Sequence, residues 1–193
     1  MYRYYRKAKV CYAYLADMPS GLSSRSVDMS FRTCRWFTRG WTLQELIAPK
    51  KIVFYAKDWE KIGTKASLQG IITDTTGVPS RVLLGWDLPS KMSIAARMSW
   101  AAGRMTTRIE DRAYSLMGMF AVYMSPIYGE GDHAFIRLQE EILKVSDDHT
   151  IFAWKTKRSG SKSGGILATS PDVFEASGEY EQLDNDSDNR RPG

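Results

Sequence analysis

Two short apolar runs in the first third of the chain predict buried β-strands. Residues 10–15 read Val-Cys-Tyr-Ala-Tyr-Leu and run into Asp17 and Pro19, and residues 52–55 read Ile-Val-Phe-Tyr. A continuous apolar run of this length is typical of a buried strand whose carboxyl end opens into a loop.

The segment between these two strands predicts a loop followed by a helix. Residues 19–30 are rich in Ser and Gly, whereas residues 41–47 have helix formers with apolar spacing and are stopped by Pro49. Strand, loop, helix and strand in this order predict a βαβ unit, and therefore a parallel sheet with a right-handed crossover.

The pattern changes to helical periodicity after Trp59. In the clearest helix, apolar residues recur at intervals of three and four, and Asp132 precedes it as a suitable N-cap. The expected helices are residues 65–73, 93–104, 110–123 and 132–145. Residues 151–154 predict one further strand, and residues 165–174 form a short apolar patch.

These elements predict an α/β fold with a partial parallel sheet, followed by a mainly α-helical region. We expect three parts: an α/β part over residues 1–60, a helical region over 61–155, and a linker with a disordered polar tail over 156–193. Because two parallel strands do not make a stable sheet, the chain is expected to begin in the middle of a domain.

Composition describes a globular intracellular protein. Hydrophobic residues make up 43% of the chain and aromatic residues 12%, and no apolar run is long enough for a signal peptide or a membrane span. A cytoplasmic location is therefore expected. The net charge of +5 is spread along the chain, apart from a basic and tyrosine-rich run over residues 2–9. That run could contact nucleic acid, but no recognisable binding motif follows it, so an exposed helix end is favoured and no nucleic-acid partner is expected.

Several long strings resemble the fungal heterokaryon-incompatibility (HET) domain family. The central one is Arg-Trp-Phe-Thr-Arg-Gly-Trp-Thr-Leu-Gln-Glu-Leu-Ile-Ala-Pro, and the resemblance extends over nearly the whole chain. The matching strings are residues 8–17, 35–49, 93–102, 106–118, 128–131, 135–141 and 146–154. The resemblance implies self/non-self recognition in filamentous fungi and programmed cell death, a form of innate immunity, with protein partners or self-association as its means.

The chain departs from this family at its beginning. Family members carry upstream strings similar to His-Thr-Trp-Gly and Trp-Ile-Asp-x-Cys-Cys-Ile-Asp, and neither occurs here. In the TIR-like fold that HET domains resemble, those segments would supply the first strands and part of a nucleotide-facing rim. The chain is therefore expected to be an incomplete domain.

Glu45 is the candidate catalytic residue. TIR domains carry a glutamate on a helix after a Trp-containing turn, and some of them cleave NAD between nicotinamide and ribose. A carboxylate suits this chemistry because it stabilises an oxocarbenium-like transition state. The alternative is a structural glutamate paired with an arginine. We expect the structural role in this short chain, so enzyme activity is not the first expectation and NAD is only a possible substrate.

Arg39, Trp36 and Trp41 are the candidate ligand-binding residues. A guanidinium matches phosphate oxygens, and the two indole rings could stack on adenine or nicotinamide. Each also has a structural alternative, namely an ion pair for the arginine and core packing for the rings.

The remaining polar clusters predict structure rather than chemistry. Asp147, Asp148 and His149 are adjacent in sequence and suit a helix cap better than a metal, so no metal site is expected. The glycines of residues 129–131 lack a dinucleotide or Walker pattern. The charges of residues 104–112 predict an internal ion-pair network, with interdomain docking as the alternative.

Overall fold

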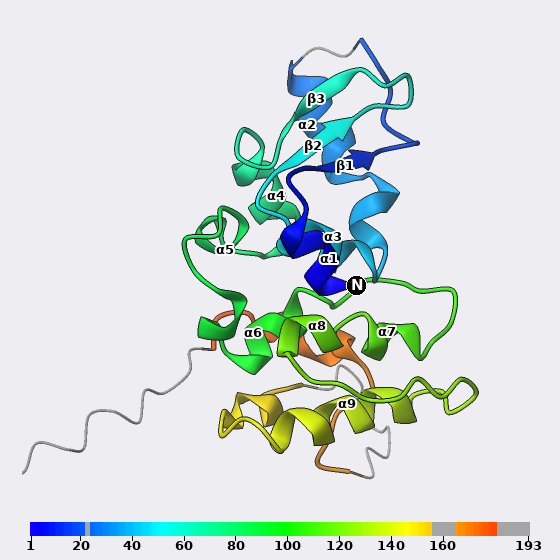
Figure 1. Cartoon of the computed structure of the whole chain (residues 1–193), viewed down its shortest axis with the longest axis vertical. Coiled ribbons are helices and arrows are strands. Elements are labelled where there is room, and N and C mark those ends of the chain that lie inside the picture. The colour runs from blue at the N-terminus through cyan, green and yellow to red at the C-terminus, as the bar shows by residue number, and fades with distance from the viewer. Residues whose placement is uncertain (22–23, 156–164, 181–193) are drawn as a thin grey trace, which may run out of the picture.

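The computed structural model describes residues 1–21, 24–155 and 165–180. Figure 1 shows a small sheet with its helices at one end of the molecule and a group of helices at the other. The first end comprises α1 (Tyr2–Lys7), β1 (Cys11–Tyr14), α2 (Ser24–Arg32), the 3₁₀ helix η1 (Arg35–Thr38), α3 (Thr42–Ile47), β2 (Ile52–Tyr55), β3 (Lys61–Thr64), α4 (Gln69–Thr76) and α5 (Ser80–Leu83). The second comprises η2 (Pro89–Lys91), α6 (Ile94–Ser99), α7 (Asp111–Tyr114), α8 (Met117–Phe120), α9 (His133–Leu143), η3 (His149–Phe152) and η4 (Pro171–Ser177).

The sheet has three strands in the order β1-β2-β3. Strands β1 and β2 are parallel with Cys11 opposite Ile52, and β3 is antiparallel to β2 with Lys61 opposite Tyr55. The predicted βαβ unit and the α/β fold followed by helices are confirmed. Strand β3 was not predicted, because its sequence Lys-Ile-Gly-Thr has little apolar character. It forms through backbone pairing at the edge of a buried strand.

The prediction of a loop over residues 19–30 is wrong in its second half, where α2 forms. The helix has a strongly one-sided apolar face, and Phe31 at its end is fully buried. Phe31 packs edge-on against Phe37 and Phe54 at centroid distances of 4.9 and 5.2 Å. Burying rings of this size stabilises the fold by about 2–3 kcal/mol each, so packing outweighs the turn preference of the serines.

The helical region is organised around α6, which begins at Ser93. The Ser93 side chain accepts a hydrogen bond from the Ala96 N–H at 3.1 Å, and Asp148 accepts one from the Ile94 N–H at 2.7 Å. Asp148 also accepts from the Thr150 N–H and caps η3, as its predicted capping role requires. The strand predicted over residues 151–154 is wrong, because η3 occupies its first half.

Helix α9 confirms most of the predicted apolar stripe, but the helix ends at Leu143, and Val145, expected to continue the stripe, is exposed. Phe135, Leu138 and Ile142 are buried, while His133 is exposed and Asp132 occupies the N-cap position without a side-chain hydrogen bond. The helix predicted over residues 110–123 is instead two short helices, α7 and α8.

The described part of the expected linker and tail packs onto α6 and α9. The Gln139 side chain donates to the Ala168 carbonyl at 2.7 Å and accepts from the Ala168 N–H at 3.0 Å. Phe174 of η4 is fully buried. Residues 156–164 and 181–193, where the flexible linker and the disordered tail were expected, lie outside the described residues.

The charged residues between α6 and α8 each find a partner outside their own cluster. Glu110 accepts hydrogen bonds from the N–H groups of Gly129 and Gly131 at 2.7 and 3.2 Å, and its own backbone N–H together with these two bonds lowers the pKa of its carboxyl. The glycine-rich loop therefore holds a carboxylate of the same chain. Arg112 pairs with Asp172 of η4, and the Arg108 guanidinium lies 4.7 Å from the centroid of the Tyr128 ring.

Within the described residues, no helix combines the length and the apolar character that crossing a membrane requires.

Candidate functional site

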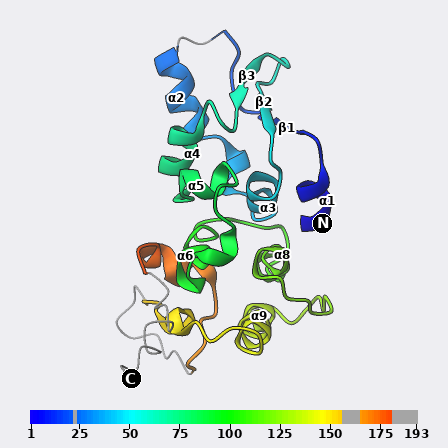
Figure 2. The same ribbon diagram turned by 60° about the vertical axis from the view of Figure 1, so that its left-hand side comes forward.

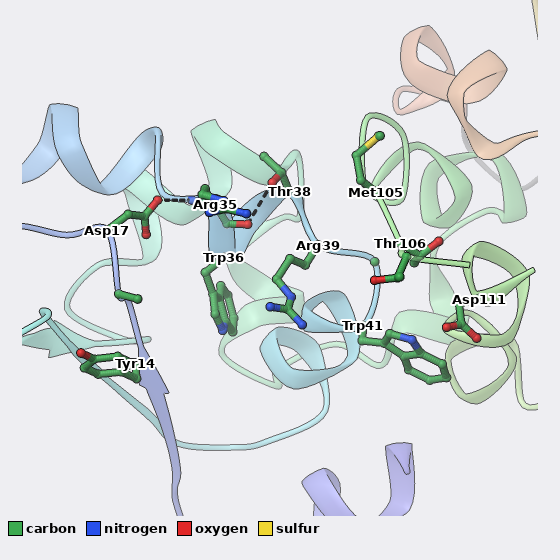
Figure 3. Close-up of a pocket in the computed structure, with 13 residues that line it drawn as sticks. Tyr14, Asp17, Arg35, Trp36, Thr38, Arg39, Trp41, Met105, Thr106 and Asp111 are labelled. Atoms are coloured by element: carbon green, nitrogen blue, oxygen red, sulfur yellow. Dashed lines mark hydrogen bonds between the residues drawn. The ribbon is translucent and has the colours of Figure 1, made fainter. Parts of the chain in front are cut away.

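The main pocket lies at the carboxyl end of β1, between the sheet and the connection from α6 to α7 (Figure 3). It has a volume of about 720 Å³. Open α/β sheets bind ligands at this position, outside the carboxyl ends of parallel strands. The lining residues are Tyr14, Ala16, Asp17, Arg35, Trp36, Thr38, Arg39, Gly40, Trp41, Met105, Thr106, Thr107 and Asp111.

Hydrogen bonds that involve backbone groups fix the two segments that form the pocket wall. The Asp17 carboxylate accepts from the Arg35 N–H at 2.8 Å and so ties the end of β1 to the start of η1. Further along, the Met105 N–H donates to the Thr38 carbonyl at 2.6 Å, and the Gly40 N–H donates to the Met105 carbonyl at 2.8 Å. Residues 38–40 are thereby held against the helical region in an isolated parallel bridge.

Two arginines, Arg35 and Arg39, and two aspartates, Asp17 and Asp111, line the pocket. The side chains of Arg35 and Arg39 are exposed, and neither forms a salt bridge within the described part of the chain. In Figure 3, Trp36 of η1 and Arg39, which directly follows η1, lie between Tyr14 on one side and Trp41 on the other. Unpaired guanidinium groups beside aromatic rings suit a ligand that combines anionic oxygens with a flat ring.

A buried arginine supports this wall from behind. Arg104 is 4% exposed, and its guanidinium donates to the carbonyls of Trp100 and Arg39 at 2.9 and 3.0 Å and to the Thr42 hydroxyl at 3.2 Å. Burial lowers the pKa of Arg104 to about 10. Its contacts orient the backbone at Arg39 and at the start of α3, which carries Trp41 at its N-cap.

Glu45 does not line this pocket. It lies in α3, one turn after Trp41, and is half-buried. Its carboxylate accepts a hydrogen bond from the Tyr5 hydroxyl of α1 at 3.1 Å. Burial and this carboxylate raise the pKa of Tyr5 to about 12. Burial, and after it the nearby Glu45 carboxylate, raise the pKa of Cys11 at the start of β1. The hydrogen bond thus joins α1 to α3.

The structure therefore brings three of the four candidate site residues together and separates the fourth. Arg39, Trp36 and Trp41 line one pocket, while Glu45 does not. Arg35, Asp17 and Tyr14 also line it and were not predicted as site residues. The position of Tyr14 and Asp17 at the carboxyl end of β1 is the signal that could have found them. Asp111 and Thr106 come from far along the chain, and no local pattern points to them.

The described residues contain no group of three or more His, Cys, Asp or Glu side chains placed to hold a metal ion.

Comparison with known proteins gives one relative over most of the chain. The chain is 42% identical, over 184 residues, to Vegetative incompatibility protein HET-E-1 of Podospora anserina. The alignment covers 88% of this chain and 13% of that protein, so the chain spans a small part of the relative's length. Residues 133–190 match a family described as Domain of unknown function (DUF8212). No solved structure matches the chain significantly.

Proposed function

We propose that this chain is a signalling module of heterokaryon (vegetative) incompatibility, in which fungal self/non-self recognition leads to programmed cell death. The observation that carries the proposal is the 42% identity to Vegetative incompatibility protein HET-E-1 over 88% of the chain. Identity at this level over so much of the chain supports a shared role for the aligned segment. The module acts through protein partners or self-association in the cytoplasm.

The pocket supports a second candidate, in which the module binds NAD or a related nucleotide. Arg39 would hold phosphate oxygens, and Trp36 or Trp41 would stack on a base, as their common position in the pocket allows. The TIR-like alternative adds cleavage of NAD by Glu45. The hydrogen bond from Tyr5 and the absence of Glu45 from the pocket lining favour a structural role for this glutamate.

Inducible expression of the chain in a filamentous fungus separates these functions. The readouts are cell death and the cellular NAD level, measured for the natural sequence, Arg39→Ala and Glu45→Ala. Death without loss of NAD, unchanged in Glu45→Ala, is the result expected for a signalling module. If the chain causes no death in any host tested, the proposal fails.

A matched control isolates the chemistry of Glu45 from its structural contact. Tyr5→Phe removes the same hydrogen bond and leaves the carboxylate in place. If Glu45→Ala abolishes NAD loss and Tyr5→Phe does not, the NAD hydrolase is the correct function. If both variants behave alike, the contact with α1 explains the effect.

Binding of NAD to the purified chain tests the pocket directly. Arg39→Ala removes a charge-assisted contact, and we expect it to weaken binding, measured by titration calorimetry, by about tenfold to a hundredfold. Arg32→Ala is the control, because Arg32 pairs with Asp74 outside the pocket. An equal loss in both variants would argue for a nonspecific charge effect.

A further inference from the structure

The outer face of the sheet is aromatic and open to solvent. Along β1, Ala13 is 5% exposed and points to the core, whereas Tyr12 and Tyr14 on the other face are 65% and 41% exposed. In Figure 2, α2 and α4 lie on one side of the sheet, and the described chain places no helix across the other side of β1–β3. Parallel strands are usually covered on both faces, so this face lacks the cover that such a sheet normally has.

Four rings form a continuous apolar surface there. Trp59, in the turn between β2 and β3, stacks on Tyr14 at a centroid distance of 4.8 Å. Tyr55 lies 5.8 Å from Trp59 and 5.8 Å from Tyr12, so it links the two pairs. We call Tyr12, Tyr14, Tyr55 and Trp59 the aromatic face.

Trp59 combines a strained backbone with an exposed ring. Its φ is +60°, in the left-handed region that costs a residue with a side chain about 1–2 kcal/mol. Glycine would fill such a turn position without strain. The indole is nevertheless 64% exposed, so core packing does not account for a tryptophan here.

Lysines surround the aromatic face. Lys61 lies directly opposite Tyr55 in the strand register, Lys57 follows the carboxyl end of β2, and Lys51 immediately precedes β2. All three are exposed, and none is in a salt bridge within the described residues. Nearby acids are fewer: Asp58 is exposed, and Glu60 accepts a hydrogen bond from the Gly21 N–H.

We propose that the aromatic face and its lysines dock the protein on the surface of an anionic lipid bilayer. Tyrosine and tryptophan rings partition to the headgroup level of a bilayer, and lysines beside them bind acidic headgroups. This is attachment from one side, which needs no spanning helix. The aromatic face adjoins the pocket at Tyr14, which belongs to both, but Trp59 and the three lysines are outside the pocket lining.

Two other occupants fit this surface less well. A second copy of the chain would bring its own lysines against these lysines, and like charges repel across an interface. Single-stranded nucleic acid binds to rings whose faces are separately free for bases. Here Tyr14 and Trp59 stack on each other, and the Tyr14 hydroxyl donates to the Lys57 carbonyl.

Sedimentation of the whole chain with lipid vesicles tests the proposal. We expect binding to vesicles of phosphatidylcholine with phosphatidylserine, weak binding to phosphatidylcholine alone, and a fall in binding as salt is raised. Each lysine at such a surface contributes about a fivefold factor, so replacing Lys51, Lys57 and Lys61 together by Gln should weaken binding about a hundredfold. Equal binding to both vesicle types would overturn the proposal.

Trp59→Gly tests the aromatic contribution without endangering the fold, because glycine relieves the strained backbone. We expect binding to fall about tenfold through loss of buried apolar area, while far-ultraviolet circular dichroism is unchanged. Trp86→Ala is the control, since Trp86 is 76% exposed outside the aromatic face. Unchanged binding in Trp59→Gly, or binding to a single-stranded oligonucleotide in place of vesicles, would reject the bilayer as the partner.

Discussion

Arginine has opposite roles in the pocket and at the contact behind it between the start of α3 and the helical region, which we call the junction. Arg35 and Arg39 in the pocket are exposed and have no salt bridge within the described chain, whereas Arg104 at the junction is buried and donates to three oxygen acceptors. A buried charge is tolerated only when its donors are satisfied, so Arg104 serves the fold. An exposed cation beside aromatic rings has little structural value and is available to a ligand. Burial together with hydrogen bonding therefore distinguishes the two roles, which residue type alone does not.

Arg104→Met is expected to have the largest effect on stability. The methionine fills part of the space but removes the Arg104 donor from the Trp100 carbonyl and one of two donors from the Arg39 carbonyl, which also accepts from the Thr42 hydroxyl. Losing these bonds inside the protein should lower the free energy of unfolding by about 3 kcal/mol. Urea denaturation followed by circular dichroism measures this change.

A substitution in the pocket provides the comparison for Arg104→Met. Arg39→Ala removes an exposed side chain and should change the free energy of unfolding by less than about 0.5 kcal/mol. Equal losses in Arg104→Met and Arg39→Ala would show that the distinction between junction and pocket is wrong.

Gly40→Ala is expected to have an intermediate effect, because Gly40 lies where the two regions meet. A Cβ atom at this position would lie 2.5 Å from Cγ2 of Thr106, closer than real carbon atoms approach. Relieving the clash separates the pocket wall from the helical region, and overpacking of this kind costs about 2 kcal/mol. Thermal unfolding of the purified variant reports the loss.

Two variants sharpen this test. Adding Thr106→Ser removes the methyl group in question and should restore most of the stability. Gly70→Ala places a Cβ in open space on α4 and should be neutral or stabilising, since alanine favours the helix. If the double variant remains as unstable as Gly40→Ala, the contact with Thr106 is not the cause.

The local sequence pattern predicted those elements whose apolar residues recur at strand or helix spacing. Strands β1 and β2 and helix α9 have apolar spacing that is readable from the sequence. In contrast, β3 depends on pairing with β2, and α2 depends on burying Phe31 against Phe54. Both depend on contacts that are distant along the chain, which a local window does not contain.

The candidate site was likewise predictable only where its residues are close together in the sequence. Trp36, Arg39 and Trp41 belong to one continuous string, so their common place in the pocket follows from a short stretch of chain. The direction of Glu45 depends on the phase of α3 relative to α1, and the Tyr5 hydroxyl that meets it is forty positions away. The far wall at Thr106 and Asp111 exists only once the helical region has packed.

The smallest effect concerns another buried cation, Lys65, which behaves like Arg104 but titrates at accessible pH. Lys65 is 3% exposed, and its ammonium donates to the carbonyls of Leu46 and Pro49 at the end of α3. Burial lowers its pKa from 10.5 to about 8. Below that pH both the folded and the unfolded chain carry the proton, so the folded state bears the full free-energy cost of burying the charge.

As the pH rises above about 8, the folded chain loses this proton while the unfolded chain keeps it, so the free energy of unfolding rises. Lys65 should contribute a rise of about 1 kcal/mol between about pH 8 and about pH 9. The Cys34 thiol opposes this rise as the pH approaches 9 and passes it: burial raises its pKa from 9.0 to about 12, so the folded chain retains a proton that the unfolded chain releases. Lys65→Met should abolish the rise, as urea titrations at the two pH values would detect. A slope that survives in Lys65→Met would mean that the buried ammonium is not its source, and that Lys65 is as well satisfied in its charged form as Arg104.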